Sequence, residues 1–190
     1  MSTSPLRKDA AQNRRHIVET ARRYVADGKP LQLNDVARTA SVGVATVYRH
    51  FPTPEALLET VALPAIEKLV RRAEHALTEA DPWIALRGFL TAAIEALLAD
   101  PAVPPVFAAA TSSLEHTSDL KRGLADAFTK LLTRAHQAGV IDSNVTEADM
   151  IPLMCGIAYA TNVHSALGPT ERATIGLRYL NLILAGLHRP

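Results

Sequence analysis

Residues 33–58, LNDVARTASVGVATVYRHFPTPEALL, contain two short amphipathic segments separated by a turn at Val42-Gly43. The apolar side chains of the first segment share one face of a helix: Val36, Ala37 and Ala40. The second segment covers residues 44–50, and Val47 and Phe51, four positions apart, lie on one face that can be buried. Two short helices joined by a tight turn that contains glycine form a helix-turn-helix, in which the second helix enters the major groove of DNA. This stretch therefore predicts a helix-turn-helix.

The charge distribution also favours a DNA-binding N-terminal part. Residues 1–50 contain nine Lys and Arg and four Asp and Glu, a net charge of +5, whereas the remaining residues carry a net charge of −4. The polar side chains on the outer face of the second segment can donate hydrogen bonds to phosphate oxygens: Thr46, Tyr48, Arg49 and His50. A basic part joined to an acidic body is typical of a DNA-binding domain attached to a second domain. Without the helix-turn-helix, the same charges would indicate only a solvated face.

The stretch resembles the DNA-binding signature of TetR-type transcriptional regulators. The residues in register with that signature are Ala37, Ala40, Val42, Thr46, Val47, Tyr48, His50 and Phe51. The chain departs from it at Ser41, where the family usually has Gly, and at Gly43, where it usually has Ser. Glycine is an acceptable N-cap, but a turn that needs positive φ favours glycine over serine at position 41. The resemblance is strong over residues 12–62 and architectural beyond them.

The composition and the capping signals predict an all-α fold of about nine helices. Ala and Leu dominate and only 9 glycines are present, which favours helix. Thr53-Pro54 and Asp81-Pro82 read as helix starts, and Pro64 predicts a bend near residues 60–64. With the resemblance, the expected organisation is a disordered arm, a three-helix helix-turn-helix DNA-binding domain, and a helical effector-binding and dimerisation domain. These parts cover residues 1–9, 10–52 and 53–190.

The resemblance implies that eight residues contact DNA: Asn34, Val44, Ala45, Thr46, Tyr48, Arg49, His50 and Thr53. Val44 and Ala45 would meet base edges, and because both are apolar they favour thymine methyl groups over bidentate hydrogen bonds. Asn34 would contact a base, Thr46 a base or a phosphate, and the other polar residues of the helix would bind the backbone. Thr53 would cap the next helix, whose N-terminal N–H groups can bind phosphate. Core packing is the alternative for Tyr48, and a plain surface position is the alternative for His50.

The C-terminal helices predict a homodimer. The last helix is apolar on more than one side, and a helix of that kind is buried. Its own subunit of 190 residues is not expected to cover every side, so a two-fold related copy is the natural partner. Six residues are expected at this interface: Met150, Ile157, Thr161, Leu177, Leu180 and Leu184.

The resemblance also implies a small-molecule effector bound in the second domain. Seven residues are candidates for lining its pocket: Trp83, Phe89, Phe107, His116, Phe128, Met154 and His164. Ligand pockets are mostly apolar with a few polar groups, which this set matches. Plain core packing is the alternative for every aromatic or Met at helical spacing.

The sequence thus predicts a sequence-specific transcriptional regulator, a repressor released from an inverted-repeat operator by a small molecule. An activator of the same fold and a DNA-binding protein without an effector are the alternatives. No enzyme is expected, because P-loop, H-E-x-x-H and G-x-S-x-G motifs are absent and Cys155 and His164, nine apart on one helix, would face opposite sides. One cysteine and scattered histidines predict no metal or cofactor. The polar N-terminus and the absence of an apolar run of roughly 18 residues predict a cytoplasmic protein with no membrane partner.

Overall fold

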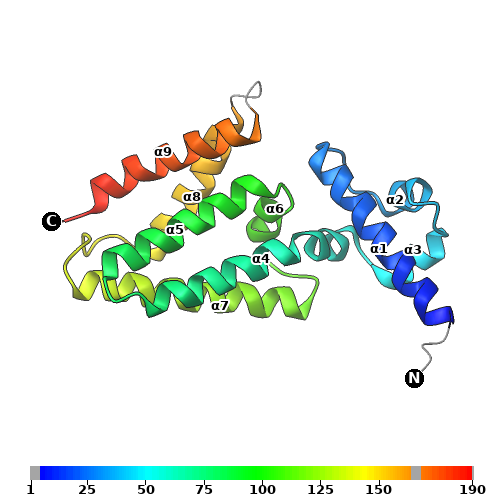
Figure 1. Ribbon diagram of the computed structural model, residues 1–190, viewed down its shortest axis with the longest axis horizontal. Coiled ribbons are helices and arrows are strands. Elements are labelled where there is room, and N and C mark those ends of the chain that lie inside the picture. The colour runs from blue at the N-terminus through cyan, green and yellow to red at the C-terminus, as the bar shows by residue number, and fades with distance from the viewer. Residues whose placement is uncertain (1–4, 164–167, 190) are drawn as a thin grey trace. The chain divides into compact units, whose positions relative to one another are not determined.

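The structure is a computed structural model that describes residues 5–163 and 168–189 of the chain. These residues form nine helices and no β-strand, in the order that Figure 1 shows. The helices are α1 (Pro5–Ala26), α2 (Leu33–Thr39), α3 (Val44–His50), α4 (Pro54–Thr78), α5 (Pro82–Ala99), α6 (Val103–Ala108), α7 (Glu115–Gln137), α8 (Glu147–Asn162) and α9 (Pro169–Leu187). The predicted all-α fold is confirmed for this part of the chain.

The first helix begins earlier than predicted. α1 starts at Pro5, so residues 5–9 belong to a helix and not to a disordered arm. Proline is favoured at the first helical position, because the N–H that it lacks would have no partner within the helix there. Residues 1–4 of the predicted arm lie outside the described residues.

The chain divides into two compact units, and the division falls inside α4. The first unit extends to Pro64 and also includes Pro101–Ser118, whereas the second begins at Ala65 and takes up α5 and the chain from Asp119 onward. This division differs from the predicted boundary between residues 52 and 53, because the start of α4 and the whole of α6 group with the helix-turn-helix. α4 runs through Pro64 as one helix and does not end there.

The core of the first unit joins α1, α2, α3 and the start of α4. Each element contributes side chains that are almost fully buried: Ile17 and Ala21, Val36 and Ala37, Val47 and Phe51, and Leu57 and Val61. Full burial of one such valine, leucine or isoleucine stabilises the folded state by roughly 1.5–3 kcal/mol. The prediction that Val47 and Phe51 form the buried face of the second segment is confirmed. This core fixes α3 and leaves its opposite face to solvent.

α5 is the central helix of the second unit and contacts both α8 and α9. Gly176 permits the close approach of α9, because a Cβ added there would lie 2.3 Å from Leu98 Cδ1. With 18 residues of mean hydropathy 1.4, α5 is long and apolar enough to cross a membrane, which corrects the expectation that no such run exists. Six of its residues are buried within the second unit: Ala85, Leu86, Phe89, Leu90, Ala92 and Ile94.

Hydrogen bonds fix two chain segments in the second unit, the C-terminal end of α4 and the residues after α9. The Arg134 guanidinium of α7 donates hydrogen bonds to the carbonyl oxygens of Leu77 at 3.1 Å and Glu79 at 2.6 Å. α7 therefore satisfies acceptors that the C-terminal end of α4 leaves without a helical partner. Near the C-terminus of the chain, the backbone N–H of Arg189 donates to the carbonyl oxygen of Val140 at 2.9 Å.

Candidate nucleic-acid interface

The outer face of α3 is the candidate DNA-reading surface. Val44 is 48% exposed and Tyr48 is 47% exposed, although apolar and aromatic side chains are commonly buried. Ala45 and Arg49 are also exposed, and Thr46 and His50 are half-buried: these are the remaining α3 residues of the predicted set. Core packing, the alternative for Tyr48, does not describe a side chain with this exposure. The face therefore presents apolar groups next to hydrogen-bond donors.

The turn before α3 depends on a left-handed residue. Ser41 has φ of +54°, whereas Gly43, the N-cap of α3, has φ of −57°. The N–H of Val42 donates to Ala37 O at 3.0 Å and the N–H of Ser41 donates to Arg38 O at 3.2 Å. This pair of hydrogen bonds is a Schellman motif, which usually places glycine at the left-handed position. The positive φ expected at position 41 is present, and serine adopts it.

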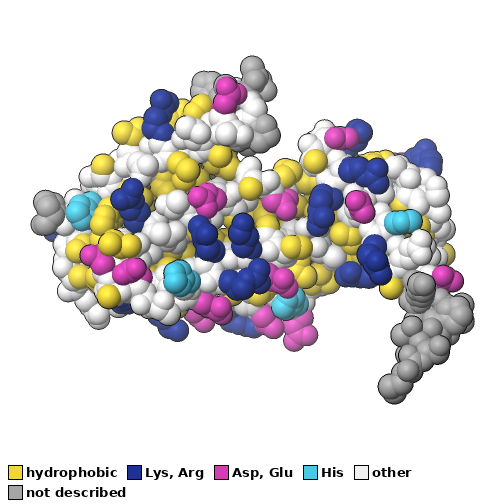
Figure 2. All heavy atoms as spheres, viewed as in Figure 1, with side chains coloured by type: hydrophobic (Ala, Val, Ile, Leu, Met, Phe, Trp, Pro, Cys, Tyr) yellow, Lys and Arg dark blue, Asp and Glu magenta, His cyan; other side chains and the backbone are white. Residues whose placement is uncertain are grey.

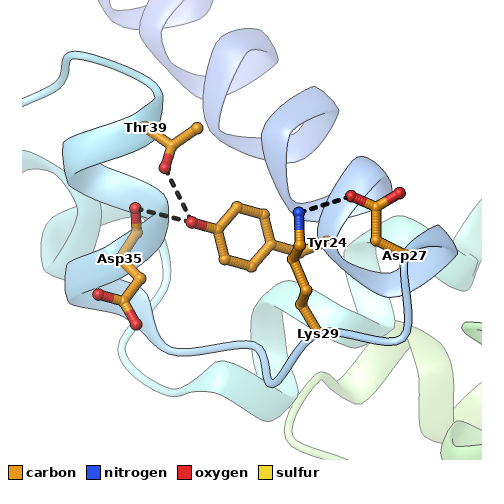
Figure 3. Close-up of polar contacts among 5 residues, drawn as sticks. All are labelled: Tyr24, Asp27, Lys29, Asp35 and Thr39. Carbon is orange, nitrogen blue, oxygen red and sulfur yellow. Dashed lines mark hydrogen bonds and ion pairs between the residues drawn. The ribbon is translucent and has the colours of Figure 1, made fainter.

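Tyr24 ties α1 to α2 (Figure 3). Its hydroxyl donates to the carbonyl oxygen of Asp35 at 3.4 Å and lies 2.8 Å from the hydroxyl of Thr39. Lys29 Nζ lies 5.7 Å from the centre of the Tyr24 ring and donates to Asp27 at 2.8 Å. That hydrogen bond to the Asp27 carboxylate raises the pKa of the Lys29 ammonium above its ordinary value. A buried or half-buried tyrosine usually finds a hydrogen-bond partner for its hydroxyl, and Tyr24 finds one on α2.

Two further residues of the predicted set flank α3. Thr53 caps α4 as predicted, because its hydroxyl oxygen accepts a hydrogen bond from the backbone N–H of Ala56 at 3.1 Å. Asn34 is exposed near the start of α2, as a base contact requires. Figure 2 shows Lys and Arg side chains over the part of the surface that carries α1–α3. The eight predicted residues thus lie on α2, α3 and the start of α4, within one unit.

Arg14 of α1 is a residue of this region that sequence reasoning missed. Its guanidinium carbon lies 5.4 Å from the centre of the Phe51 ring. His50 contacts the same ring, with the two ring centres 6.2 Å apart. The sequence signal that could have identified Arg14 is its spacing: among the basic residues of α1, Arg14 is the one three positions before the buried Ile17.

The residues predicted to line an effector pocket are not brought together within either unit. Trp83, Phe89, Phe128 and Met154 belong to the second unit, Phe107 and His116 to the first, and His164 lies outside the described residues. Phe89 and Phe128 are buried with ring centres 5.7 Å apart, and Met154 is buried as well, which agrees with core packing, the alternative given for these three. The ring of Trp83 lies tilted against that of His188, with centres 4.2 Å apart, and Trp83 borders a cavity of about 10 Å³, which is room for about one water molecule.

Most of the residues predicted at the dimer interface are not accessible in the single chain. Five of the six are buried inside the chain's own fold: Met150, Ile157, Thr161, Leu180 and Leu184. They lie on the faces of α8 and α9 that pack within the second unit, and a buried side chain cannot meet a second copy. Leu177 is half-buried and borders an open groove of about 410 Å³ on α9. The exposed large apolar side chains on these two helices and at the C-cap of α8 are different ones: Leu153, Tyr159, Val163 and Leu182.

Comparison with known proteins identifies the family. A family model for the C-terminal domain of SbtR-like TetR transcriptional regulators matches residues 81–189. Among solved structures, a TetR transcriptional regulator from Streptomyces coelicolor is 31% identical, with 92% of this chain and 98% of that chain covered and a TM-score of 0.55. A TetR regulatory protein from Mycobacterium vanbaalenii is 28% identical, with 97% and 100% covered and a TM-score of 0.50. A search of curated proteins found no match.

A third solved structure, FadR from Bacillus subtilis in complex with stearoyl-CoA, is 16% identical and shares the fold, with 91% and 98% of the chains covered and a TM-score of 0.62. The unit with the helix-turn-helix and the second helical unit together define the all-α architecture of TetR-type regulators. The chain belongs to the TetR family, which confirms the resemblance drawn from residues 33–58.

Proposed function

We propose that this protein is a sequence-specific DNA-binding repressor that binds an inverted-repeat operator as a homodimer and acts in the cytoplasm. The observation that carries the proposal is the outer face of α3. Val44 and Tyr48 are exposed there while Val47 is completely buried. One face of α3 therefore packs on the core, and the opposite face is open to solvent. A short helix held in this way is what the major groove admits.

The candidate residues on α3 and beside it fall into two groups, those that would contact bases and those that would bind the DNA backbone. Val44, Ala45 and Asn34 would contact base edges, with the two apolar residues on thymine methyl groups. Tyr48, Arg49 and His50 would bind phosphates, which position the protein without reading sequence. Thr46, half-buried at the same face, would reach a base or a phosphate.

The homodimer would form through the exposed faces of α8 and α9. Tyr159 is 75% exposed and Leu182 is 67% exposed, which supports a partner for these helices. On α9 the open groove is lined by Thr174, Leu177, Arg178, Asn181 and Leu182. A two-fold interface on these helices would place two copies of α3 about one turn of DNA apart, ~34–36 Å, or a multiple of it.

The proposal also includes a small-molecule effector that releases the protein from its operator. FadR from Bacillus subtilis, which shares the fold, was solved with stearoyl-CoA, and that supports an effector for this chain. The effector would act by binding the DNA-incompetent conformation more tightly than the DNA-bound one. Stearoyl-CoA is therefore the first probe for displacing the protein from its operator.

The test is selection from random DNA duplexes with the full-length protein, followed by fluorescence anisotropy on the enriched sequence. We expect an inverted repeat, tighter binding to the full repeat than to one half-site, and survival of the complex in excess random DNA. Selection that enriches no sequence would overturn sequence-specific binding. A reporter gene with the operator in its promoter then separates the repressor from the activator, because an activator would raise expression.

A further inference from the structure

The ring of Phe51 is a fixed apolar platform at the C-terminal end of α3. Phe51 is 2% exposed, and its backbone N–H donates to the carbonyl oxygen of Val47 at 2.8 Å. Arg14, which comes from α1, lies over this ring, and His50 lies beside it. A guanidinium over an aromatic ring is attracted by the negative face of the ring and loses conformational freedom in that position. The platform therefore holds Arg14 in place before any ligand arrives.

The charge of Arg14 is not neutralised by an acidic neighbour. In the same unit Arg38 pairs with Asp35 and Lys29 pairs with Asp27. Arg14 is exposed and forms no ion pair with any carboxylate in the described part of the chain. A guanidinium held over a ring by its central carbon still has N–H donors that can bind the oxygens of a phosphate. Arg14 thus presents an oriented, uncompensated cation next to α3.

We propose that Arg14 binds a phosphate of the DNA backbone, with Phe51 as the platform that orients it. The inference rests on the proposed DNA-binding function and adds a residue of α1 to the interface. Because Phe51 caps α3, the phosphate contact from Arg14 is coupled to the placement of α3 in the major groove. Such a contact carries no sequence information and acts on every DNA sequence.

Arg15 is a matched control on the same helix. Successive residues of a helix are about 100° apart, so Arg14 lies about 60° around α1 from the buried Ile17 and Arg15 lies about 160° away. Arg15 is exposed and has the same charge, but it points away from the core and from Phe51. The two arginines therefore separate a placed phosphate contact from the general effect of positive charge on the unit.

The experiment measures how the affinity of the full-length protein depends on KCl concentration. The DNAs are the selected operator and a scrambled duplex, and the proteins are wild type, Arg14→Gln, Arg15→Gln and Arg14→Lys. Loss of one phosphate contact lowers the steepness of log K against log salt by ~0.9, and a homodimer loses one contact in each subunit, so the total decrease should be ~1.8. We expect that decrease for Arg14→Gln on both DNAs, a wild-type slope for Arg15→Gln, and a slope near wild type for Arg14→Lys, which keeps the charge.

Three outcomes would overturn the inference. They are an unchanged slope for Arg14→Gln with unchanged affinity, an unchanged slope for Arg14→Gln with lower affinity, which would indicate a structural role, and an equal decrease in slope for Arg15→Gln. A wild-type protein that binds operator and scrambled DNA equally would refute the proposed sequence specificity, while the slopes on scrambled DNA would still decide the role of Arg14. If the wild type bound no DNA, both proposals would fail.

Discussion

The buried carboxylate of Glu59 in α4 accepts a hydrogen bond from the backbone N–H of Leu114, at 2.9 Å. Its other oxygen accepts from the N–H of Ser113 at 2.6 Å. A buried charge is costly unless hydrogen bonds satisfy it, and here both oxygens are used. The contact joins the start of α4 to the segment between α6 and α7, and it explains why that segment belongs to the same compact unit.

Replacement of Glu59 by Gln will destabilise the protein. Glutamine keeps the shape but presents an NH2 group to one of the two N–H donors, so one charge-assisted hydrogen bond is lost and a donor is left unpaired. We expect the free energy of unfolding to fall by about 1.5–3 kcal/mol, measured by urea denaturation. Glu74→Gln, at an exposed position of α4, is the control and should stay within about 0.5 kcal/mol of wild type. Equal stability of Glu59→Gln and wild type would contradict the prediction.

Replacement of Ser41 by Gly will stabilise the protein. A non-glycine residue in the left-handed region costs about 1–2 kcal/mol, and the extra chain entropy of glycine offsets about 0.5–1 kcal/mol of the relief. The free energy of unfolding should therefore rise by about 0.5–1 kcal/mol. Gly28→Ala is the opposite control, because Gly28 has φ of +66° and alanine should lower stability there. A decrease in stability for Ser41→Gly would show that the serine side chain contributes more than the strain costs.

Substitutions of Asn34 and Tyr48 will affect DNA binding in different ways. Asn34→Ala should reduce discrimination at one base pair of each half-site by about 1–3 kcal/mol, because a base contact is lost. Tyr48→Ala should weaken binding to operator and random DNA about equally and change the salt slope little, since the side chain is uncharged. Both are measured by anisotropy on single-base operator variants. Equal loss on specific and random DNA for Asn34→Ala would refute its base contact.

A charge on the exposed face of α8 will disrupt the homodimer. Tyr159→Glu adds a carboxylate to a side chain that is open to solvent in the single chain, so folding should persist while a buried interface would have to accept an unpaired charge. Sedimentation velocity should then show a monomer. Ile84→Glu, at an exposed apolar position of α5, is the control and should sediment like wild type. A dimeric Tyr159→Glu protein would place the interface elsewhere.

Acid will weaken the start of α8 through Asp149. Hydrogen bonds from the side chain and the backbone N–H of Thr146 lower the pKa of the Asp149 carboxyl below its ordinary value of 3.8. A lowered pKa in the folded state contributes stability above the unfolded pKa, and that stability is lost as pH falls through the folded pKa. The difference in melting temperature between wild type and Asp149→Asn should be largest above about pH 4 and shrink in more acidic solution. A difference that does not change with pH would contradict this role.

The sequence predicted the helix-turn-helix closely because its signals are local. Such signals depend on residues a few positions apart, such as those of a turn or a cap, or Val47 and Phe51. The structure has the predicted helices α2 and α3, and Val47 and Phe51 are buried. The dimer residues are harder to choose from sequence, because α8 and α9 are apolar on two faces and periodicity does not tell which face the chain itself covers. The face with Met150 and Leu180 packs inside, so the available face is the one with Tyr159 and Leu182.

The contacts that sequence reasoning missed join residues far apart in the chain. Glu59 and Leu114 are separated by 55 positions, and neither carries a pattern that points to the other. Arg14 and Phe51 meet only after α1 and α3 have packed on a common core. Local propensity contains no information about such pairs, and a fold is needed to bring them together.

Because α6 belongs to the first unit, the helix-turn-helix of this chain cannot be exchanged for that of a relative by replacing the N-terminal residues alone. A fragment that stops at Pro64 would carry every helix of the helix-turn-helix but would leave the Glu59 carboxylate without its two N–H partners. In a chimaera whose N-terminal helices come from a relative, those helices would have to provide an acceptor for the N–H groups of the segment between α6 and α7. The compact unit that carries the helix-turn-helix is therefore discontinuous in sequence, and two separate stretches of the gene must be inherited together to encode it.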